Sequence, residues 1–323
     1  MSRTQFLCLG VGDGWHSQQL QKACEANDAT LVGAAYESLG AQIESGRTVL
    51  SCEAGPLDRF DAILTRTMPM GSLETITFRL SILHHLHAQR ARPAIVNPPR
   101  SLEMAIDKFA TLARVRDLGY SVPETIAVQS RAEAMAAWSA LGGDCIVKPL
   151  FGGEGRGVMR ITERELAWTA FSTLEQIQSV MYVQRFVPPG GRDTRLLVIG
   201  GEVLGIYRQN DRDFRANVAG GGRSEAIELD QALVDMAHRI SDSIGLTFAA
   251  VDLIHTSDGS PMVIEVNGIP GWKGAQATTQ DSIAERIVRH LHACVRNRAA
   301  ALKQDHVNHD GNQKTHAAEA ASQ

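Results

Sequence analysis

The chain has 323 residues and a mass of 35.0 kDa, which is about two domains at roughly 150 residues each. Its 32 Lys and Arg residues against 36 Asp and Glu residues give a net charge of −4, which excludes a global basic field for nucleic acid or anionic membranes. No apolar run approaches the roughly 18 residues needed to span a bilayer, and no signal segment opens the chain, so we expect a soluble, cytoplasmic protein. Five scattered cysteines form no CxxC pair, which predicts reduced structural thiols.

The first 97 residues alternate strand-like and helix-like segments. Strands are expected at 6–9, 31–35, 62–66 and 94–96, with helices from Ser17 and over 73–89. This alternation predicts an α/β domain over residues 1–97, built on an open parallel sheet. Asn97-Pro98-Pro99 forces extended backbone and marks the end of the domain.

The rest of the chain mixes helices and strands and predicts an α+β arrangement. Helices are expected at 101–118, 131–141, up to about Gln178, at 231–244 and at 283–295, and strands at 145–148, from Val158, and at 181–186, 195–199, 203–208, 251–254 and 262–266. We divide this part into subdomains of residues 98–183 and 184–295. Residues 296–323 carry almost no bulky apolar side chains and are expected to be a disordered tail.

A glycine-rich loop, Gly152-Gly153-Glu154-Gly155-Arg156-Gly157, lies between two of these strands. Glycine lets backbone N–H groups converge on an anion, so the loop can hold phosphates, although a flexible hairpin is an equally good interpretation of the loop alone. Lys148 directly precedes the loop, and Lys108 lies in an otherwise apolar helix. Two cations at one phosphate site would be sensible, but a single lysine is usually solvated.

Two acidic residues are expected to face each other across a hairpin. If Asp258-Gly259 is its two-residue turn, Asp252 and Glu265 are cross-strand partners. Like charges at this spacing repel, so something must neutralise them. Asn267 shares the face of Glu265, and two carboxylates with an amide oxygen suit Mg²⁺ or Mn²⁺. An acidic hairpin face in solvent is the alternative.

Several arginines lie between the loop and the hairpin. They occur in Arg192-Asp193-Thr194-Arg195, at Arg208 and in Phe214-Arg215-Ala216-Asn217. Guanidinium groups would supply bidentate donors to phosphoryl oxygens, although each arginine alone is more often a surface residue.

Taken together, these blocks resemble the ATP-grasp superfamily, and most closely its branch of RimK-type glutamate ligases that modify ribosomal protein S6. The blocks are Asp107-Lys108, Ile146-Val147-Lys148-Pro149, the 152–157 loop, Val183-Gln184-Arg185-Phe186, Arg192-Asp193-Thr194-Arg195, Phe214-Arg215-Ala216-Asn217, Val251-Asp252 and Ile264-Glu265-Val266-Asn267. The resemblance runs from about Asn97 to Leu291. The segment 66–74 is also similar to RimK-like proteins linked to tetrahydromethanopterin-dependent one-carbon metabolism.

The resemblance implies an ATP-grasp fold, preceded by the open parallel-sheet domain, with ATP held between two α+β subdomains. The implied nucleotide-binding residues are Lys108, Lys148, Gly153, Glu154, Gly155, Gly157, Gln184, Arg185, Phe186, Asp193, Arg215 and Asn217. The backbone of Arg185 and Phe186 would hydrogen-bond adenine, and Asp193 would lie near the ribose. Asp252, Glu265 and Asn267 would bind two Mg²⁺ or Mn²⁺ ions.

The implied reaction is ATP-dependent amide formation, in which a carboxylate becomes an acyl phosphate that an amine captures, releasing ADP and phosphate. Arg208 and Arg215 are the expected catalytic residues. The expected partners are a small-molecule acceptor carboxylate and an amino-acid amine, with L-glutamate added to a coenzyme such as a pterin or furan cofactor by a homo-oligomer, either a dimer or a tetramer. Trp272 and Lys273 depart from the S6-modifying enzymes in a loop that borders their acceptor site, so S6 is not the expected acceptor. Trp272 either stacks on a planar ring or packs internally.

Other functions stay open. The chain could act on a protein or peptide C-terminus, or it could be a catalytically silent ATP-binding module. A nicotinamide oxidoreductase would use the segment Gly10 to Gly14, with Glu37 as ribose acceptor. However, Trp15 replaces the third glycine of that fingerprint, which favours a simple tight turn.

Overall fold

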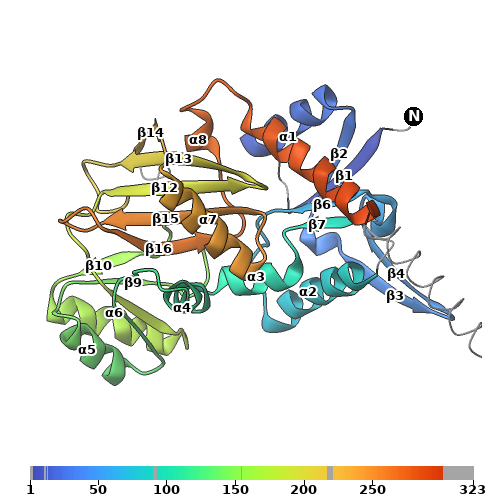
Figure 1. Cartoon of the computed structure of the whole chain (residues 1–323). Helices are drawn as coiled ribbons and strands as arrows, with labels where there is room; N and C mark the ends of the chain where they lie inside the picture. Colours follow the sequence, from blue (N-terminus) through green and yellow to red (C-terminus); the bar gives the residue numbers. More distant parts are fainter. Residues whose placement is uncertain are drawn as a thin grey trace, which may run out of the picture. The chain divides into compact units, whose positions relative to one another are not determined.

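The computed structural model describes residues 3–10, 12, 14–89, 93–153, 155–216 and 221–300 (Figure 1). The chain divides into two compact units. Unit 1 comprises Met1–Pro99 together with Ser282–Gln323, and unit 2 comprises Arg100–Asp281. The first boundary therefore lies beside the predicted Asn97-Pro98-Pro99 break, whereas the last helix groups with unit 1 and not with residues 184–295.

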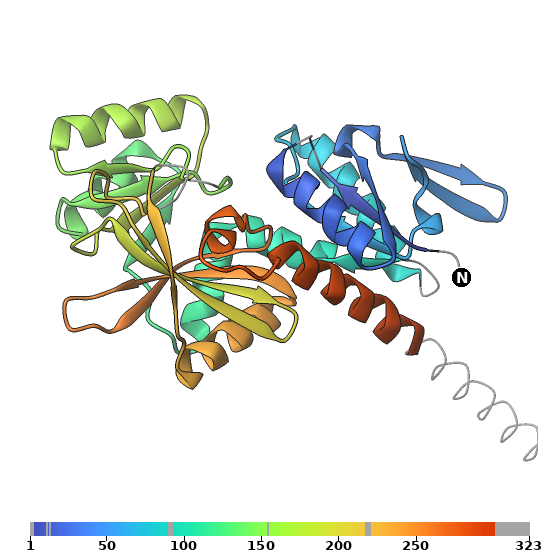
Figure 2. The same cartoon turned by 90° about the horizontal axis from the view of Figure 1, so that it is seen from above.

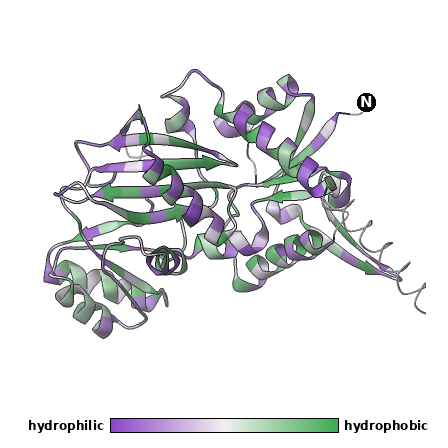
Figure 3. Ribbon diagram, in the orientation of Figure 1, coloured by the Kyte–Doolittle hydropathy of each residue, from purple (hydrophilic) through white to green (hydrophobic). Residues whose placement is uncertain are grey.

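Unit 1 is built on a parallel sheet with strand order β2-β1-β6-β7, which confirms the predicted open parallel sheet. Its strands are β1 (Thr4–Leu9), β2 (Ala29–Ala34), β6 (Ala62–Thr65) and β7 (Ala94–Val96), and its first helices are α1 (Trp15–Ala26) and α2 (Leu73–Ala88). Every residue of β6 and β7 is buried, as expected for parallel strands covered on both faces. The same strands are apolar in Figure 3.

A second, antiparallel sheet in unit 1 is absent from the sequence-based expectation. It has the order β3-β4-β5, with β3 (Gly40–Glu44), β4 (Arg47–Cys52) and β5 (Gly55–Pro56). Gly46 closes the β3–β4 turn with φ +88°, a conformation that favours glycine. Two short 3₁₀ turns, η1 (Tyr36–Ser38) and η2 (Leu57–Arg59), flank this sheet.

The last helix spans residues 283–300 and packs on unit 1 (Figure 2). His292 Nε2 lies 3.1 Å from the carbonyl oxygen of Asn27, and its ring is 5.0 Å from that of Phe6. Arg298 donates to the carbonyl oxygen of Gln89 at 2.9 Å. The helix therefore continues beyond the predicted end near Val295, through residues assigned to the tail. Residues 301–323 lie outside the described residues.

Unit 2 contains two antiparallel sheets. The first has the order β10-β9-β11-β8 and is covered by two helices. Its elements are β8 (Thr125–Val128), α5 (Arg131–Ala140), β9 (Cys145–Lys148), β10 (Met159–Ile161), α6 (Arg164–Gln176) and β11 (Met181–Arg185). Ala134 and Phe171, on the two helices, pack with Val147 and Val183 in one buried cluster. Because β11 continues to Arg185, the predicted boundary between 183 and 184 falls inside a strand.

The second sheet of unit 2 has the order β14-β13-β12-β15-β16. Its elements are β12 (Arg192–Ile199), β13 (Glu202–Gln209), β14 (Arg223–Ile227), α7 (Gln231–Ile244), β15 (Phe248–His255) and β16 (Pro261–Asn267), followed by the short α8 (Lys273–Gln276). Helix α7 packs Ala237 and Ile240 against Leu196 and Val251 of this sheet. The polar face of the sheet is thereby left for other contacts.

The predicted helix over 101–118 is two helices, α3 (Pro99–Ile106) and α4 (Lys108–Asp117). The chain breaks at Asp107, whose carboxylate accepts from the N–H groups of Phe109 and Ala110 at 2.8 and 3.0 Å. This is the N-cap arrangement that aspartate favours. The break makes Lys108 the first residue of α4, and its N–H donates to the carbonyl oxygen of Leu150 at 3.4 Å. Lys108 is thus held beside the glycine-rich loop.

Asp252 and Glu265 are cross-strand partners, as predicted, but the expected two-residue turn is wrong. The strands are joined by a longer turn in which Thr256 N–H donates to the Ser260 carbonyl oxygen at 3.0 Å. The outer pairs, such as Leu253 with Val263, are one residue out of the register of the inner pairs. A β-bulge at Ile264 absorbs the difference and restores the pairing of Asp252 with Glu265.

No helix in the described part of the chain is both long and apolar enough to cross a membrane. All five cysteines have free thiols, and four of them are buried. Burial raises the pKa of the Cys8 thiol to about 12 and that of Cys145 to about 11. These thiols therefore stay protonated and unreactive, in agreement with the predicted structural role.

We predict that Gly191→Ala destabilises unit 2. Gly191 has φ +68°, and a Cβ there would lie 2.6 Å from the Asn210 carbonyl oxygen and 2.9 Å from that of Asp213. A left-handed non-glycine residue costs about 1–3 kcal/mol before any clash, so the midpoint of thermal unfolding should fall by several degrees. Gly201→Ala is the matched control, because a Cβ at Gly201 meets nothing within 4 Å. Equal midpoints for the two variants would contradict this account.

Candidate active site

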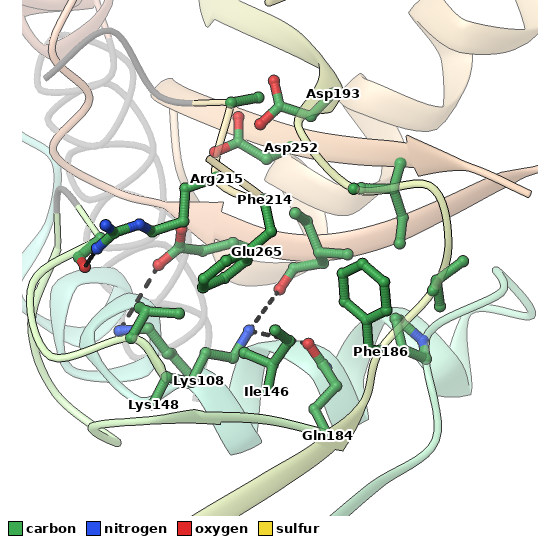
Figure 4. A pocket seen from close by; sticks show the side chains of 18 of the residues that line it. Lys108, Ile146, Lys148, Gln184, Phe186, Asp193, Phe214, Arg215, Asp252 and Glu265 are labelled. Carbon is green, nitrogen blue, oxygen red and sulfur yellow. Dashed lines mark hydrogen bonds and ion pairs between the residues drawn. The ribbon is translucent and has the colours of Figure 1, made fainter. Parts of the chain in front are cut away.

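A pocket in unit 2 is lined by residues from both of its sheets (Figure 4). It brings together most of the residues singled out from the sequence. These are Lys108, Lys148, Gly153, Gly155, Gln184, Arg185, Phe186, Asp193, Arg208, Arg215, Asp252, Glu265 and Asn267. Gly157 is not among the lining residues; it has φ +71° and its Cα packs against Pro149. Glu154 and Asn217 lie outside the described residues.

One wall of the pocket is apolar and was only partly foreseen. Besides Phe186, it includes Ile146, Val187, Phe214 and Ile264. Such a wall suits a planar ring, since apolar and aromatic side chains line most small-molecule sites. Apolar residues carry no chemical signature in a sequence, so only the folded structure shows that these side chains line one pocket.

Phe186 is supported from behind by a charged pair. The guanidinium carbon of Arg160 lies 3.6 Å from the centroid of the Phe186 ring. Arg160 also donates to both carboxylate oxygens of Asp144, at 2.9 and 2.7 Å. The aromatic wall is therefore tied to β10, the strand that follows the glycine-rich loop.

The backbone N–H groups of Arg185 and Phe186 are already used within the protein. Arg185 N–H donates to the Glu124 carbonyl oxygen at 2.8 Å, and Phe186 N–H donates to that of Asp144 at 3.0 Å. These two N–H groups are therefore unavailable to adenine, and the expected backbone contact would have to use carbonyl oxygens of the same two residues. The next residue, Val187, also lines the pocket. The side chain of Arg185 turns away to bind Glu124, with Nε 2.6 Å from Oε2.

Lys148 is buried at the base of the pocket. Its Nζ donates to Gln184 Oε1 at 3.1 Å and to the Ile264 carbonyl oxygen at 3.4 Å, which the bulge presents to it. Gln184 is fixed in turn by a 2.9 Å bond to Thr125 Oγ1. Burial lowers the pKa of Lys148 to about 8; attraction to Glu265 opposes the shift, and repulsion from Lys108 adds to it. Lys148 is therefore a cation that an anionic ligand would stabilise.

Lys108 approaches the same space from α4. Its Nζ donates a short hydrogen bond to the Gly152 carbonyl oxygen and lies 3.6 Å from Glu265 Oε1. Figure 4 shows the ends of the two lysines in the same part of the pocket, with Glu265 close to both. The structure thus brings the two cations and the glycine-rich loop to one place.

Asp252 is held by two arginines. Arg195 Nε and Nη2 bind its two oxygens at 2.7 Å each, and Arg208 Nη2 lies 3.2 Å from Oδ2. Burial opposes ionisation, but Arg195 and then Arg208 outweigh it and lower the pKa of Asp252 to about 2. The neutralising charges that the two opposed acids require are therefore supplied by the protein itself. Protein cations already neutralise both, since Lys108 lies beside Glu265.

Arg195 has a larger role than the sequence suggested. It is the cross-strand partner of Asp252 on β12, and its Nη1 also donates to the Gly271 carbonyl oxygen at 3.4 Å. Strands β12 and β15 are far apart in the chain, so no local pattern predicts this pairing. Arg195 consequently connects the acidic centre to the loop that precedes α8.

Asp193 lines the pocket and is paired with Arg208. Arg208 donates Nε to its Oδ1 at 2.6 Å and Nη2 to its Oδ2 at 2.8 Å, and both side chains are buried. Each carboxylate oxygen keeps a second lone pair, and Asp193 lines the pocket, so its position near the ribose stays a prediction. Burial raises the pKa of Asp193 to about 6, although Arg208 opposes the shift.

Arg215 reaches the glycine-rich loop, as expected of a phosphate-binding residue. Its Nη1 donates to the Gly155 carbonyl oxygen at 3.3 Å. Its Nη2 lies 2.6 Å from Asp213 Oδ2, and this pairing raises the pKa of Arg215 further. The guanidinium is thus a permanent cation at the mouth of the loop.

The donor set of Asp252, Glu265 and Asn267 fits a hard divalent cation. Asp252 opposes Glu265 in register, and the Asn267 amide lies 3.4 Å from Asp252 Oδ2. This site has only two acidic side chains, and no group of three or more His, Cys, Asp or Glu side chains in the described ranges is arranged to hold a metal ion. Two carboxylates and an amide oxygen match Mg²⁺, which usually takes few protein ligands and completes its shell with phosphates and water.

Two alternatives raised by the sequence are settled by packing. Trp272 is fully buried, with its ring 6.0 Å from that of Phe248, so it packs internally and does not stack on a ligand. A Cβ at Gly10 would lie 2.6 Å from the Thr67 carbonyl oxygen and 2.7 Å from the Tyr36 ring. Gly10 is therefore explained by close packing at a tight turn, and the nicotinamide interpretation has no support from this geometry. Val11 and Asp13 lie outside the described residues.

Comparison with known proteins places this site in a family. Residues 105–291 match the RimK-like ATP-grasp domain. Tetrahydromethanopterin:alpha-L-glutamate ligase of Methanosarcina acetivorans is 30% identical over 265 residues, which cover 73% of this chain and 81% of the relative. Alpha-aminoadipate–LysW ligase LysX of Sulfurisphaera tokodaii is 30% identical over 202 residues, covering 61% of this chain and 70% of LysX.

The fold is shared with solved ligases. The structure of the ATP-grasp ligase PsnB with minimal precursor, Mg and ADP aligns with a TM-score of 0.69 at 21% identity, covering 90% of this chain and 97% of that one. The predicted ATP-grasp fold and the resemblance to RimK-type ligases are therefore confirmed. ATP-grasp ligases use ATP and Mg²⁺. With two lysines and a glycine-rich loop opposite an acidic hairpin, and a family match over more than half its length, the chain belongs to the RimK-like ATP-grasp family of amide-forming, ATP-dependent ligases.

Proposed function

We propose that this enzyme adds L-glutamate, or a similar amino acid, to the carboxylate of a small coenzyme such as a pterin or furan cofactor. Two relatives named tetrahydromethanopterin:alpha-L-glutamate ligase each align over 73% of this chain, which supports this acceptor class. The observation that carries the ligase chemistry is the pocket itself. There, Lys108, Lys148 and the glycine-rich loop converge opposite the Asp252–Glu265 pair.

The pocket offers a distinct place for each part of ATP. The base would lie against the apolar wall. Val187 is part of that wall and follows Arg185 and Phe186, whose N–H groups are already bonded within the protein. The triphosphate would extend toward Lys108, Lys148 and Arg215, which supply positive charge at the glycine-rich loop. Asp252, Glu265 and Asn267 would hold two Mg²⁺ ions, which neutralise phosphate charge when bound.

In the proposed reaction, an acceptor carboxylate oxygen attacks the γ-phosphorus and the bond to the leaving ADP breaks. The amine nitrogen then attacks the acyl carbon of the acyl phosphate, and phosphate leaves. No protein nucleophile is needed, because positioning and charge stabilisation supply most of the catalysis in phosphoryl transfer. Arg208 would stabilise the acyl phosphate or the tetrahedral intermediate. Its Nε and Nη2 are bound to acids, but its Nη1 has no partner among the described residues and could donate to the reacting group.

A peptide or protein C-terminus is the second candidate acceptor. The relative LysX is named for ligation to LysW, and PsnB was solved with a precursor peptide. Acceptors of both kinds present a carboxylate, so the chemistry at the pocket would be the same. Identifying the molecule that gains the amino acid would distinguish a coenzyme acceptor from a peptide or protein acceptor.

The first test is the product of ATP. Incubation with ATP, Mg²⁺, labelled L-glutamate and extracts of small molecules or of peptides should release ADP and add one or more labelled residues, detected by mass spectrometry. Release of AMP would contradict the acyl-phosphate route. ATP binding without turnover across both acceptor classes would indicate the catalytically silent module.

Glu265→Gln should abolish turnover while the protein stays folded. The substitution removes one metal-ligand charge, and Lys108, 3.6 Å away, keeps its short bond to the Gly152 carbonyl oxygen. Asp252→Asn is the less suitable test. It leaves Arg195 without its counterion, although Arg208 keeps Asp193, and breaking a buried ion pair costs about 3–5 kcal/mol. ADP release and the thermal midpoint should be measured together, and wild-type turnover in Glu265→Gln would refute the metal assignment.

The affinity for ATP should fall at high pH because of Lys148. Its pKa in the free enzyme is about 8, so a rising pH removes the charge that a polyphosphate requires. The apparent Kd of a non-hydrolysable ATP analogue should therefore rise by about tenfold between about pH 7 and about pH 9. Lys148→Arg keeps its charge over this range and should bind with a nearly flat pH profile, as measured by calorimetry. A flat profile in the wild type would show that Lys148 does not contact the phosphates.

A further inference from the structure

The polar face of the second sheet in unit 2 carries a charge cluster of two acids and two arginines. Asp193 and Arg195 lie two residues apart on β12, and each faces an oppositely charged partner on a neighbouring strand. Asp193 is paired in register with Arg208 on β13, and Arg195 is paired in register with Asp252 on β15. All four side chains are largely buried, and their charges cancel.

Asp193 and Asp252 compete for the same guanidinium nitrogen. Arg208 Nη2 lies 2.8 Å from Asp193 Oδ2 and 3.2 Å from Asp252 Oδ2. Arg208 also donates Nε to Asp193 at 2.6 Å, so its bidentate edge belongs to Asp193 and only the longer contact reaches Asp252. A buried guanidinium needs a counterion, so it would turn fully to Asp252 if Asp193 lost its charge.

The number of arginine contacts to Asp252 matters because a metal ion would share this carboxylate with the arginines. Oδ2 of Asp252 already accepts from Arg195 Nη2 at 2.7 Å and lies 3.4 Å from the Asn267 amide nitrogen. A second full arginine contact would occupy the remaining lone pair of Oδ2 and place another positive charge beside the cation. Asp193 uses both of its oxygens to hold Arg208.

We propose that Asp193 is a positioning residue that holds Arg208 and thereby keeps Asp252 available to a divalent cation. This inference rests on the proposed function, because it takes Asp252 as a metal ligand. It assigns to Asp193 a role in metal affinity.

The test measures Mn²⁺ binding to the enzyme–ADP complex by electron paramagnetic resonance, which does not depend on turnover. Asp193→Asn should weaken Mn²⁺ binding by at least about tenfold, because Arg208 then neutralises Asp252. The double variant Asp193→Asn with Arg208→Met should bind Mn²⁺ as tightly as Arg208→Met alone. A purely structural role for Asp193 predicts no such rescue, so a double variant as weak as Asp193→Asn would overturn the proposal.

The single variant Arg208→Met tests independently whether Arg208 competes with the metal ion for Asp252. This test does not depend on the folding of Asp193→Asn. Asp252 then keeps only Arg195, so Mn²⁺ should bind more tightly than in the wild type; equal or weaker binding would overturn the proposal. Asp211→Asn is the control, because Asp211 forms an exposed pair with Arg223 at 2.9 Å and its loss removes the same charge. Thermal unfolding checks that each variant is folded. Absence of Mn²⁺ binding in the wild-type ADP complex would instead count against the proposed function.

Discussion

The register of strand β12 between its two neighbours is the constraint on which the active site depends. It sets Asp193 opposite Arg208 and Arg195 opposite Asp252, and the next pairing in the sheet sets Asp252 opposite Glu265. A slip of one residue would move every one of these side chains to the other face of the sheet, against α7. The apolar contacts of Leu196 and Val251 with α7 forbid that slip, so the core of unit 2 fixes the arrangement of its charges.

This arrangement also implies that the hairpin acids and Lys148 would change partners when ligands bind. The two acids of the hairpin are balanced by arginines and a lysine, whereas the hydrogen bonds of Lys148 go to neutral oxygens and its Nζ lies 5.1 Å from the centroid of the Tyr182 ring. Phosphate groups would bring negative charge to the lysines, and divalent cations would bring positive charge to the two carboxylates. A triphosphate without a cation would meet two carboxylates, and a cation without a triphosphate would meet several protein cations, so the site is suited to the two together.

Much of the site was predictable because its chemistry is carried by charged residues and glycines in short blocks. The two lysines, the glycine-rich loop and the Asp252–Glu265 pair are all found together. The expected turn at Asp258-Gly259 was wrong, and the pairing survived only because a bulge at Ile264 compensates by one residue. The break at Asp107 was missed although aspartate is a strong N-cap, because a continuous apolar pattern on both sides favours a single helix.

The sequence by itself determined many of the helices and strands, the parallel sheet of unit 1 and the family of the pocket, because local propensity and short motifs are written along the chain. It missed the β3-β4-β5 sheet and strands β8 and β14. Only the tertiary structure decided what Asp193, Arg195 and Trp272 do. Arg195 and Asp193 acquire their partners from strands 57 and 15 residues away, and Trp272 is buried against Phe248. Their roles depend on which strands lie side by side, and that is settled by the packing of the whole sheet, which no local stretch of sequence contains.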